Sequence, residues 1–419
     1  MYGKHCKSRC KTSWLATSVS IREVAYLACP YMLEVLFWIL LFILFYAYFG
    51  YGLLLGLWRL LFPKKRDYPT DFFPAVTLVV PAFNEATVIE KKIQNCFLLS
   101  YPRQLLTILV ITDGSTDNTP QLVRKYPSLV HLHQPERKGK SAALNRAMKE
   151  VRSPFVVFTD ANTELQSDSI QKMMRHYVDE KTGGVSGEKR IVDTAHTAVG
   201  RGERIYWRYE SMLKKLSADF YTLIGAAGEL FSIRTALFEP LNEDVILDDF
   251  VLSARICGKG YRFAYEQEAY TLEAASETIT EEKERKVRIS AGCFQALFLL
   301  KDLLNPVRNG RLFFQYFSHR VLRWVFCPLC IPLVLLVNCY LVYSQQAWPY
   351  LSFLWLQVTC YLLAFVGWVF AAKPGFPKIL LIPYYFVFMN ISLYTGFIFF
   401  LTGKQSVLWK KAQRSSFSD

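Results

Sequence analysis

The sequence predicts an α/β domain inserted between membrane-spanning helices, and three observations lead to this fold class. Four long runs of apolar residues carry almost no charge. The polar segment between the first and second runs alternates strand-like and helix-like stretches. The stretch from 293 to 323 mixes large apolar residues with Arg and Lys, a composition typical of amphipathic helices in the membrane interface. Because the apolar excess (52% of residues) is concentrated in the four runs, a wholly soluble protein is excluded.

The apolar runs are long enough to span a bilayer. A hydrocarbon core of about 30 Å requires roughly 20 apolar residues in a helix. The first run is also too long for a cleaved signal peptide, so we expect a retained anchor. We therefore predict an integral membrane protein with the following organisation: an N-terminal tail (1–33), a transmembrane helix (34–62), a soluble domain (73–292), interfacial helices (293–323), about three transmembrane helices (324–403) and a C-terminal tail (404–419).

Basic residues flank the soluble domain on both sides. Lys64, Lys65 and Arg66 follow the first run, and Arg308 and Arg311 precede the second. By the positive-inside rule, the domain between them is cytoplasmic. Both tails are basic as well, so either one C-terminal run lies in the interface or a basic tail crosses the membrane.

The net charge of +14 fits membrane lipids with anionic headgroups, and also a diphosphate-bearing substrate. The basic residues are scattered and form no nucleic-acid recognition motif. We therefore expect no nucleic-acid partner.

The soluble domain has the pattern of a sheet covered by helices. Strand-like stretches at 76–83, 105–114, 129–134 and 155–161 alternate with segments of helical spacing. Such alternation predicts a parallel sheet, with ligands bound at the carboxyl ends of its strands.

Polar clusters stand where four of these strands are expected to end. They are Pro81-Ala-Phe-Asn84-Glu85, the segment 113–117 (DGSTD), the segment 136–140 (ERKGK) and Asp160-Ala-Asn162. One such cluster is an ordinary turn signal. Four clusters at the same edge of a sheet predict a shared polar site.

Three other chemistries are disfavoured by local sequence. Gly139-Lys140-Ser141 imitates the end of a P-loop, but Gln134 stands where that loop requires glycine. His131 and His133 have no third metal ligand nearby, so packing is the expected role of both. The Cys-x-x-Cys pair formed by Cys327 and Cys330 lies inside an apolar run, where a zinc or redox site is not expected.

The motifs PAFNE, DGSTDNT, KGKSAALN, DAN and ILDDFVLSARICGKGYR, in this order, resemble the membrane-embedded members of glycosyltransferase family 2. This group includes cellulose, chitin, hyaluronan and poly-N-acetylglucosamine synthases. The resemblance covers residues 73–292 and implies a GT-A-type nucleotide-sugar-binding domain. It implies inverting transfer of a sugar from a UDP-sugar donor to a saccharide acceptor, with extrusion of a β-linked polysaccharide.

The resemblance also implies roles for individual residues on the donor side. Residues matching Pro81, Asn84, Glu85 and Asp113 line the nucleoside pocket, and Lys140 approaches the phosphates as a point charge. The Asp160-Ala-Asn162 motif matches the family's metal motif, which binds Mg²⁺ or Mn²⁺ through the diphosphate. Asp160 supplies an anionic oxygen, whereas Asn162 supplies an amide oxygen or contacts the sugar. Helix capping is the alternative for this motif.

On the acceptor side, the pair Asp248-Asp249 matches the family's acidic pair, and Asp249 takes the role of catalytic base. Adjacent carboxylates raise each other's pKa, which suits a base that holds a proton transiently. Capping of the following helix is the alternative reading. Gly228 and Glu229 match a segment that passes near the acceptor sugar, although a tight turn explains them equally well.

One motif departs from the family pattern. Processive synthases carry Gln-x-x-Arg-Trp, whereas this chain has Arg285-Lys-Val-Arg288-Ile289. Two arginines one turn apart suit a diphosphate, and a solvated charged helix is the alternative reading. Replacement of the tryptophan by Ile289 removes a sugar-stacking platform. The alternative functions are therefore a single transfer to a lipid-linked acceptor, or a non-catalytic membrane subunit that binds a nucleotide sugar.

Overall fold

The computed structural model describes residues 21–63, 68–69, 71–192, 198–274, 279–370 and 380–403. Among them, eight strands form one sheet in the order β3-β2-β1-β4-β7-β6-β8-β5. The strands are β1 (Val76–Ala82), β2 (Leu106–Asp113), β3 (Val130–Gln134), β4 (Phe155–Thr159), β5 (Glu164–Leu165), β6 (Thr182–Val192), β7 (Leu230–Arg234) and β8 (Arg262–Ala274).

The sheet is mixed, and the predicted parallel pairing is correct for β3, β2, β1 and β4 and again for β6 with β8. Strands β3, β2, β1 and β4 pair in parallel. Strand β7 then runs antiparallel to both β4 and β6. The parallel half has the carboxyl ends of β1, β2 and β4 at one edge, as the strand-end motifs require.

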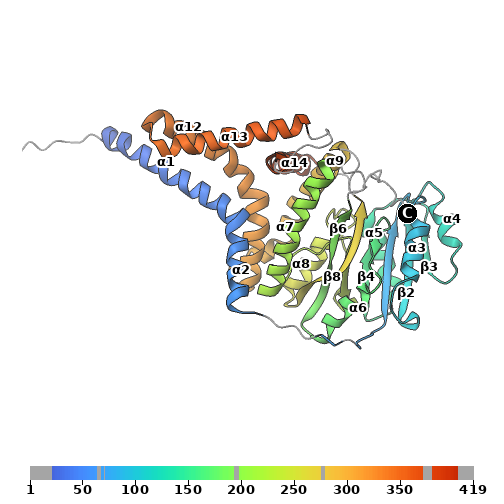
Figure 1. The fold of residues 1–419 in the computed structure, drawn as a ribbon. Coiled ribbons are helices and arrows are strands. Elements are labelled where there is room, and N and C mark those ends of the chain that lie inside the picture. Colours follow the sequence, from blue (N-terminus) through green and yellow to red (C-terminus); the bar gives the residue numbers. More distant parts are fainter. Residues whose placement is uncertain are drawn as a thin grey trace, which may run out of the picture.

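Two apolar cores cover the two faces of the sheet, because alternate residues of each strand point to opposite sides. On β1, Val79 packs into one core, whereas Leu78 and Val80 pack into the other. The first core includes helices α5 (Lys140–Glu150) and α8 (Asp248–Gly258). The second includes α3 (Ile89–Phe97), α4 (Thr119–Arg124) and α6 (Ser169–Met174). The domain is therefore a helix–sheet–helix sandwich (Figure 1).

Two long helices connect this sandwich to the rest of the chain. Helix α7 (Ala198–Phe220) packs against β6 and β8 on one side and against α2 (Tyr51–Leu61) on the other. Helix α9 (Ile279–Leu299) packs against α14 (Leu381–Thr402). The approach of α14 to α9 is close, since a Cβ on Gly396 would lie 2.4 Å from the Cβ of Ser290. Only glycine fits at this position without moving a helix.

The remaining helices lie to the side of the sheet (Figure 1). Helix α1 (Ile21–Phe45) continues through a π-helical turn, η1 (Tyr46–Gly50), into α2, and it packs along α12 (Cys327–Gln345). Short helices α10 (Pro306–Asn309) and α11 (Arg311–Tyr316) and the π-helical segment η6 (Phe317–Phe326) lead into α12. Helix α13 (Trp348–Phe370) packs on α14.

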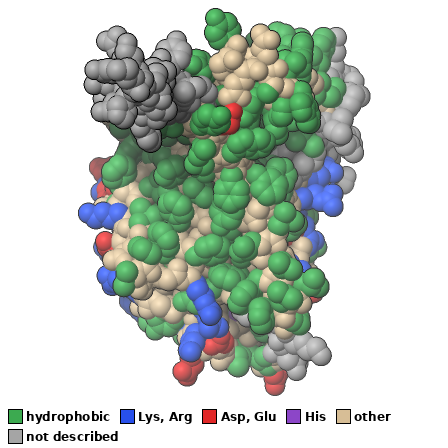
Figure 2. All heavy atoms as spheres, turned by 90° about the vertical axis from the view of Figure 1, so that its left-hand side faces the viewer, with side chains coloured by type: hydrophobic (Ala, Val, Ile, Leu, Met, Phe, Trp, Pro, Cys, Tyr) green, Lys and Arg blue, Asp and Glu red, His purple; other side chains and the backbone are tan. Residues whose placement is uncertain are grey.

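Four helical spans of the described chain are long and apolar enough to cross a membrane: Tyr31–Leu61, Arg311–Gln345, Trp348–Phe370 and Leu381–Thr402. Figure 2 shows a face of the molecule dominated by hydrophobic side chains, with charged side chains mainly toward its edges and lower part. A large exposed apolar surface marks a membrane or protein contact. Together with the spans, it identifies an integral membrane protein.

The structure places two element boundaries differently from the sequence. Helix α1 begins at Ile21, inside the predicted N-terminal tail. The second span begins at Arg311, inside the segment 293–323 that we assigned to interfacial helices, because α11 and η6 continue into α12 without a break in the helix. The segments 1–20 and 404–419, which include most of the predicted tails, lie outside the described residues.

Candidate functional site

Lys140 is the centre of a cluster of charged side chains. It is the first residue of α5, after Gly139, whose backbone has a φ of 96° that favours glycine. The Lys140 ammonium lies 2.8 Å from Asp160 Oδ1 and 3.7 Å from Asp248 Oδ2. Asp160 follows β4 and Asp248 begins α8, so three segments distant in the chain meet at one lysine. This arrangement brings the KGK, DAN and LDD motifs together.

The two carboxylates at the start of α8 are partly or fully buried. Burial and the negative charge of Asp248 raise the pKa of Asp249 to about 7, and Lys140 only partly opposes this. Burial also raises the pKa of Asp248. Asp249 Oδ1 accepts a hydrogen bond from the Phe250 amide at 2.8 Å. Asp248 Oδ2 is buried and has no hydrogen-bond partner among the described residues, apart from the nearby charge of Lys140.

Gly228 packs directly against the Asp249 carboxylate. A Cβ at this position would lie 3.1 Å from Asp249 Oδ2 and 3.6 Å from Lys140 Nζ. A larger residue would crowd both groups. The absence of a side chain at Gly228 therefore keeps space beside the carboxylate of Asp249.

The two arginines of α9 have different surroundings. Burial lowers the pKa of Arg288, and the nearby charges of Asp248, Asp160 and Asp249 oppose this effect. Arg285 forms an ion pair of 2.9 Å with the buried carboxylate of Glu282. The structure therefore directs Arg288 toward the cluster and engages Arg285 within its own helix. Ile289 follows Arg288, where the processive pattern has tryptophan.

Glu229 belongs to a buried chain of charges beside the cluster. Lys189 Nζ lies 2.6 Å from Glu229 Oε1 and also forms a close ion pair with Glu273. Although burial alone would raise the pKa of Glu229, the charge of Lys189 lowers it well below its usual range. Glu273 Oε1 in turn accepts a hydrogen bond of 3.4 Å from the Asn162 amide. Glu229 is thus held by a lysine, which limits its freedom to contact a sugar.

Asp113 is buried at the end of β2 and fixes the loop before Lys140. Its Oδ2 accepts hydrogen bonds from the amides of Lys138 (3.0 Å) and Gly139 (2.7 Å). Its Oδ1 lies 3.3 Å from the Arg146 guanidinium. The carboxylate therefore positions the backbone that presents Lys140.

The first motif is tied to the second by hydrogen bonds. Asn84 has a φ of 54°, in the left-handed region, and its amide oxygen accepts a hydrogen bond of 2.8 Å from the Thr116 amide. The Glu85 amide donates to Thr119 Oγ1 at 2.8 Å. Pro81 is buried in β1, in register with Ile111 of β2. These contacts shape one wall at the carboxyl edge of the sheet.

Sequence reasoning missed several charged residues near the site. Lys92 of α3 is buried and donates to Thr159 Oγ1 (2.9 Å) and the Thr163 carbonyl (2.7 Å), which bracket Asp160 and Asn162. Burial lowers the pKa of Lys92 to about 8. Lys92 lies between Ile89 and Ile93 on the apolar face of α3, so the sequence alone could have indicated that this lysine is buried.

Two further cations line the site. Lys214 of α7 is buried, and burial lowers its pKa, whereas the charge of Glu229 opposes this. It lies 5.4 Å from the centre of the Trp207 ring, which is also 5.0 Å from Lys189. Arg137, next to the KGK motif, lies 3.6 Å from the ring centre of Phe83. Lys214 lies in no motif, so only the fold identifies it, whereas Arg137 belongs to the polar cluster 136–140 predicted from the sequence.

The histidine pair lies on β3 and the cysteine pair lies in α12. His131 and His133 both lie within hydrogen-bond distance of Thr112 Oγ1, at 3.0 and 2.9 Å. Cys327 and Cys330 are buried free thiols in α12. Among the described residues, no group of three or more His, Cys, Asp or Glu side chains has the arrangement of a metal site. A cation bound at the carboxylate cluster around Lys140 would therefore need oxygen ligands from a bound substrate as well.

The chain is similar in sequence to known glycosyltransferases. Residues 77–242 match the model of the family described as Glycosyl transferase family 2. The chain is 27% identical over 280 residues to the poly-beta-1,6-N-acetyl-D-glucosamine synthase of Staphylococcus aureus (strain COL), covering 64% of this chain and 66% of that protein. It is 28% identical over 233 residues to the probable glycosyltransferase YdaM of Bacillus subtilis (strain 168), covering 52% and 54%. In both cases less than two thirds of the relative is matched.

A solved structure shares the fold. The mannosyltransferase PcManGT from Pyrobaculum calidifontis, in complex with GDP-Man and Mn²⁺, superimposes with a TM-score of 0.68 at 22% identity. The similarity covers 89% of this chain and 99% of that chain. Because the sheet domain makes up only part of the protein, a similarity over 89% of the chain must also include helices outside that domain.

Proposed function

Residues 77–242 are a glycosyltransferase family 2 domain with a GT-A fold, and from this premise we propose that the protein is a membrane-bound inverting glycosyltransferase. It transfers a sugar from a UDP-sugar to a saccharide acceptor and extends a β-linked polysaccharide. The observation that supports this best is the convergence of Asp160, Asp248 and Asp249 on Lys140.

Asp249 is the proposed catalytic base. It removes the proton from the acceptor hydroxyl as that oxygen bonds to the anomeric carbon of the donor. The bond from the anomeric carbon to the diphosphate breaks at the same time, and the nucleoside diphosphate leaves with the electron pair. A carboxylate with a pKa near 7 is well matched to accepting a proton at neutral pH. Attack opposite the leaving group inverts the configuration at carbon.

The cations of the site neutralise the leaving diphosphate. Lys140 and Arg288 both face the carboxylate cluster, and Arg288 offers a planar donor group suited to phosphate oxygens. We assign Arg285 a supporting role in donor binding, through the helix that it shares with Arg288. Pro81, Asn84, Glu85 and the loop fixed by Asp113 form the proposed nucleoside side of the site.

A divalent cation, Mg²⁺ or Mn²⁺, fits the oxygen donors of this cluster. Asp160 is partly exposed, and the amide nitrogen of Asn162 is directed to Glu273, which leaves the amide oxygen as the donor. The buried Asp248 Oδ2, without a hydrogen-bond partner among the described residues, is a further oxygen ligand of the kind that these ions prefer. When bound, the ion supplies positive charge to the departing diphosphate. The similar solved structure contains Mn²⁺.

On the acceptor side, Gly228 leaves room for a sugar hydroxyl beside Asp249. Glu229 contributes to the acceptor wall as an ion-paired group rather than a free carboxylate. The similarity to a poly-N-acetylglucosamine synthase supports a saccharide acceptor. Ile289, in place of tryptophan, supports the second candidate, a single transfer to a lipid carrier.

The proposed site lies on the cytoplasmic side of the membrane. The two spans that bracket the domain end at Leu61 and begin at Arg311, and basic residues follow the first and start the second. By the positive-inside rule these ends are cytoplasmic. Labelling of single cysteines introduced on either side of a span, in intact cells, checks this orientation.

The test of the proposed function is transfer by purified protein in lipid, with labelled UDP-sugars and either Mg²⁺ or Mn²⁺. We expect Asp249→Asn to lower kcat by about 10²- to 10⁴-fold, the usual contribution of a general base, while donor affinity is retained. A ladder of products indicates a polymerase, whereas one product soluble in organic solvent indicates a lipid acceptor. Wild-type protein that binds every donor tested but neither transfers nor hydrolyses it would contradict the proposal.

The pH dependence of transfer gives an independent check. Because the base must be ionised, kcat/KM should fall about tenfold per pH unit below the pKa of Asp249, near pH 7. In Asp248→Asn, loss of the neighbouring negative charge lowers the pKa of Asp249. The acid limb of the residual activity should therefore move to lower pH. If the acid limb of the pH profile does not move, the group that titrates there is not Asp249.

A further inference from the structure

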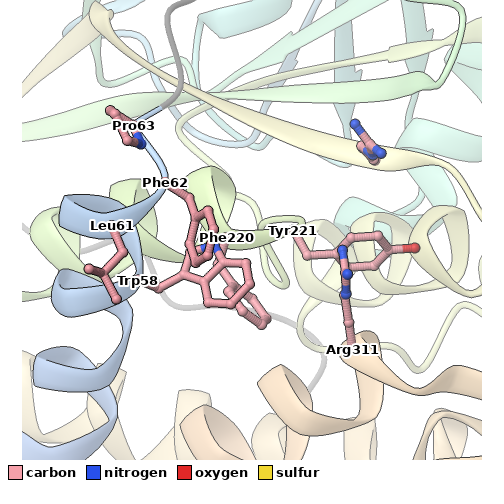
Figure 3. Close-up of a pocket in the computed structure, with 8 residues that line it drawn as sticks. Trp58, Leu61, Phe62, Pro63, Phe220, Tyr221 and Arg311 are labelled. Atoms are coloured by element: carbon pink, nitrogen blue, oxygen red, sulfur yellow. The ribbon is translucent and has the colours of Figure 1, made fainter.

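A cavity of about 520 Å³ lies where the membrane helices meet the edge of the sheet domain. It is bordered by the ends of α2 and α7, the start of β8 and the start of α11 (Figure 3). Its lining combines aromatic and basic side chains: Trp58, Phe62, Phe220, Tyr221, Arg262 and Arg311. None of these residues belongs to the carboxylate cluster around Lys140.

The cavity is at the level where two candidate spans end. The first span ends at Leu61 and the second begins at Arg311, and both residues line the cavity. The ends of a span lie near the lipid headgroups, where tryptophan and tyrosine are enriched because their rings are amphipathic. Trp58 and Tyr221 match this preference. The cavity therefore opens at the boundary between membrane and water.

The charged side chains that line the cavity, Arg262 and Arg311, are both basic. No carboxylate of the described chain forms an ion pair with Arg262 or Arg311. The nearby Asp219 is instead paired with Arg59 at 3.1 Å. Arg262 lies 5.9 Å from the ring centre of Tyr221, and Figure 3 shows Arg311 beside the same ring. Guanidinium groups bind phosphate oxygens through paired hydrogen bonds, so this arrangement suits an anionic phosphate group.

We propose that this cavity binds the headgroup of an anionic membrane phospholipid. Arg262 and Arg311 contact the phosphate, and the rings of Trp58, Phe62 and Phe220 pack against the apolar part of the lipid near the glycerol. Because the lining comes from α2, α7, β8 and α11, one lipid would connect two membrane spans to the sheet. Strand β8 also carries Glu273, and α7 carries Lys214, so the lipid would steady elements that reach the proposed active site.

The test measures lipid binding to the full-length protein in detergent by native mass spectrometry. Phosphatidylglycerol and phosphatidylcholine are added separately to wild-type protein and to the double variant Arg262→Gln/Arg311→Gln. We expect wild type to retain phosphatidylglycerol in preference to phosphatidylcholine, and the double variant to lose about tenfold or more in affinity, equivalent to about 1.4 kcal/mol. The matched control Arg308→Gln removes an exposed arginine of α10 and should bind as wild type does.

Several outcomes would overturn the proposal. These are equal retention of phosphatidylglycerol by wild type and the double variant, equal loss in Arg308→Gln, or no preference over phosphatidylcholine. If inorganic phosphate raises the melting temperature of lipid-free wild type but not of the double variant, and no lipid is retained, the ligand is a free anion instead. If the double variant fails to fold, the single variant Arg311→Gln is tested for phosphatidylglycerol binding instead. Arg311 is exposed, so its replacement should not disturb folding. The result does not depend on transfer activity, so it is independent of the proposed function.

Discussion

The two halves of the candidate site use their acidic residues in different ways. At the ends of the parallel strands, Asp113 and Asp117 accept hydrogen bonds from backbone amides of neighbouring loops. At the start of α8, Asp248 has a buried oxygen without a hydrogen-bond partner among the described residues, and the pKa of Asp249 is raised to about 7. The carboxylates of the first half hold the shape of the loops, whereas those of the second half are only partly satisfied, by Lys140 and by the Phe250 amide. Unsatisfied charge is what binding and proton transfer require.

The comparison implies that satisfied and unsatisfied residues respond differently to substitution. Replacing a satisfied group should cost stability and change activity only indirectly. Replacing an unsatisfied group should cost activity and leave stability unchanged or improved. Five substitutions test this contrast.

The largest stability effect is expected at Lys189, the satisfied centre of the buried ion pairs. Lys189→Met leaves Glu229 and Glu273 buried without their shared counter-charge. Breaking a buried pair in this way costs about 3–5 kcal/mol of folding free energy. Thermal unfolding in detergent measures this, with Lys125→Met as the control, because the Lys125–Glu90 pair is exposed. Equal losses in both variants would contradict the prediction.

Asp113→Asn should destabilise the protein by about 1.5–3 kcal/mol, the contribution of hydrogen bonds to a charged group. The neutral side chain no longer attracts the amides of Lys138 and Gly139 as strongly, and the loop that presents Lys140 loosens. We expect the KM for donor to rise more than kcat falls. Glu90→Gln, at an exposed ion pair, is the control. Normal stability together with lost kcat would assign Asp113 to the chemistry and remove the contrast.

Asp249→Asn should raise stability at alkaline pH by about 1.4 kcal/mol or more, since one pKa unit corresponds to that free energy. Folding raises the pKa of this carboxyl, so its ionised form destabilises the native state. The difference from wild type should grow as pH rises from about 4 to 7 and stay constant above pH 7. Melting temperatures across this range measure it, with Asp244→Asn on the preceding exposed loop as the control. A destabilised Asp249→Asn would show that the carboxylate is a structural group.

The smallest effect distinguishes the two arginines of α9. Arg288→Gln should lower kcat/KM by about tenfold, because its charge faces Asp248 and Asp160. Arg285→Gln should change kcat/KM less, since Lys286 still lies 3.5 Å from Glu282. The two variants remove the same charge from the same helix, so each is the control of the other. The opposite order of effects would place Arg285, rather than Arg288, at the diphosphate.

The sequence by itself determined the membrane spans, the α/β domain and the motifs of the site. Long uncharged runs and alternating apolar strands are local patterns, and such patterns can be recognised without knowledge of the fold. The order of the polar clusters was also sufficient to place them at one edge of a sheet. Lys140 and Asp160 could therefore be predicted as candidate residues before their positions were known, whereas Asp249 was predicted from its resemblance to the family's acidic pair.

Only the tertiary structure decided which of these residues are paired and which are not. It showed Asp113 bonded to backbone, Glu229 held by Lys189, and Arg285 engaged by Glu282. It also brought in Lys189, Glu273 and Lys214, which no motif marks, and set β7 antiparallel in the sheet. The reason is physical: a side chain's charge state and partners depend on burial and on neighbours distant in the chain. Neither the charge state nor the partners of a side chain can be read from the sequence, because both arise only when the chain has folded.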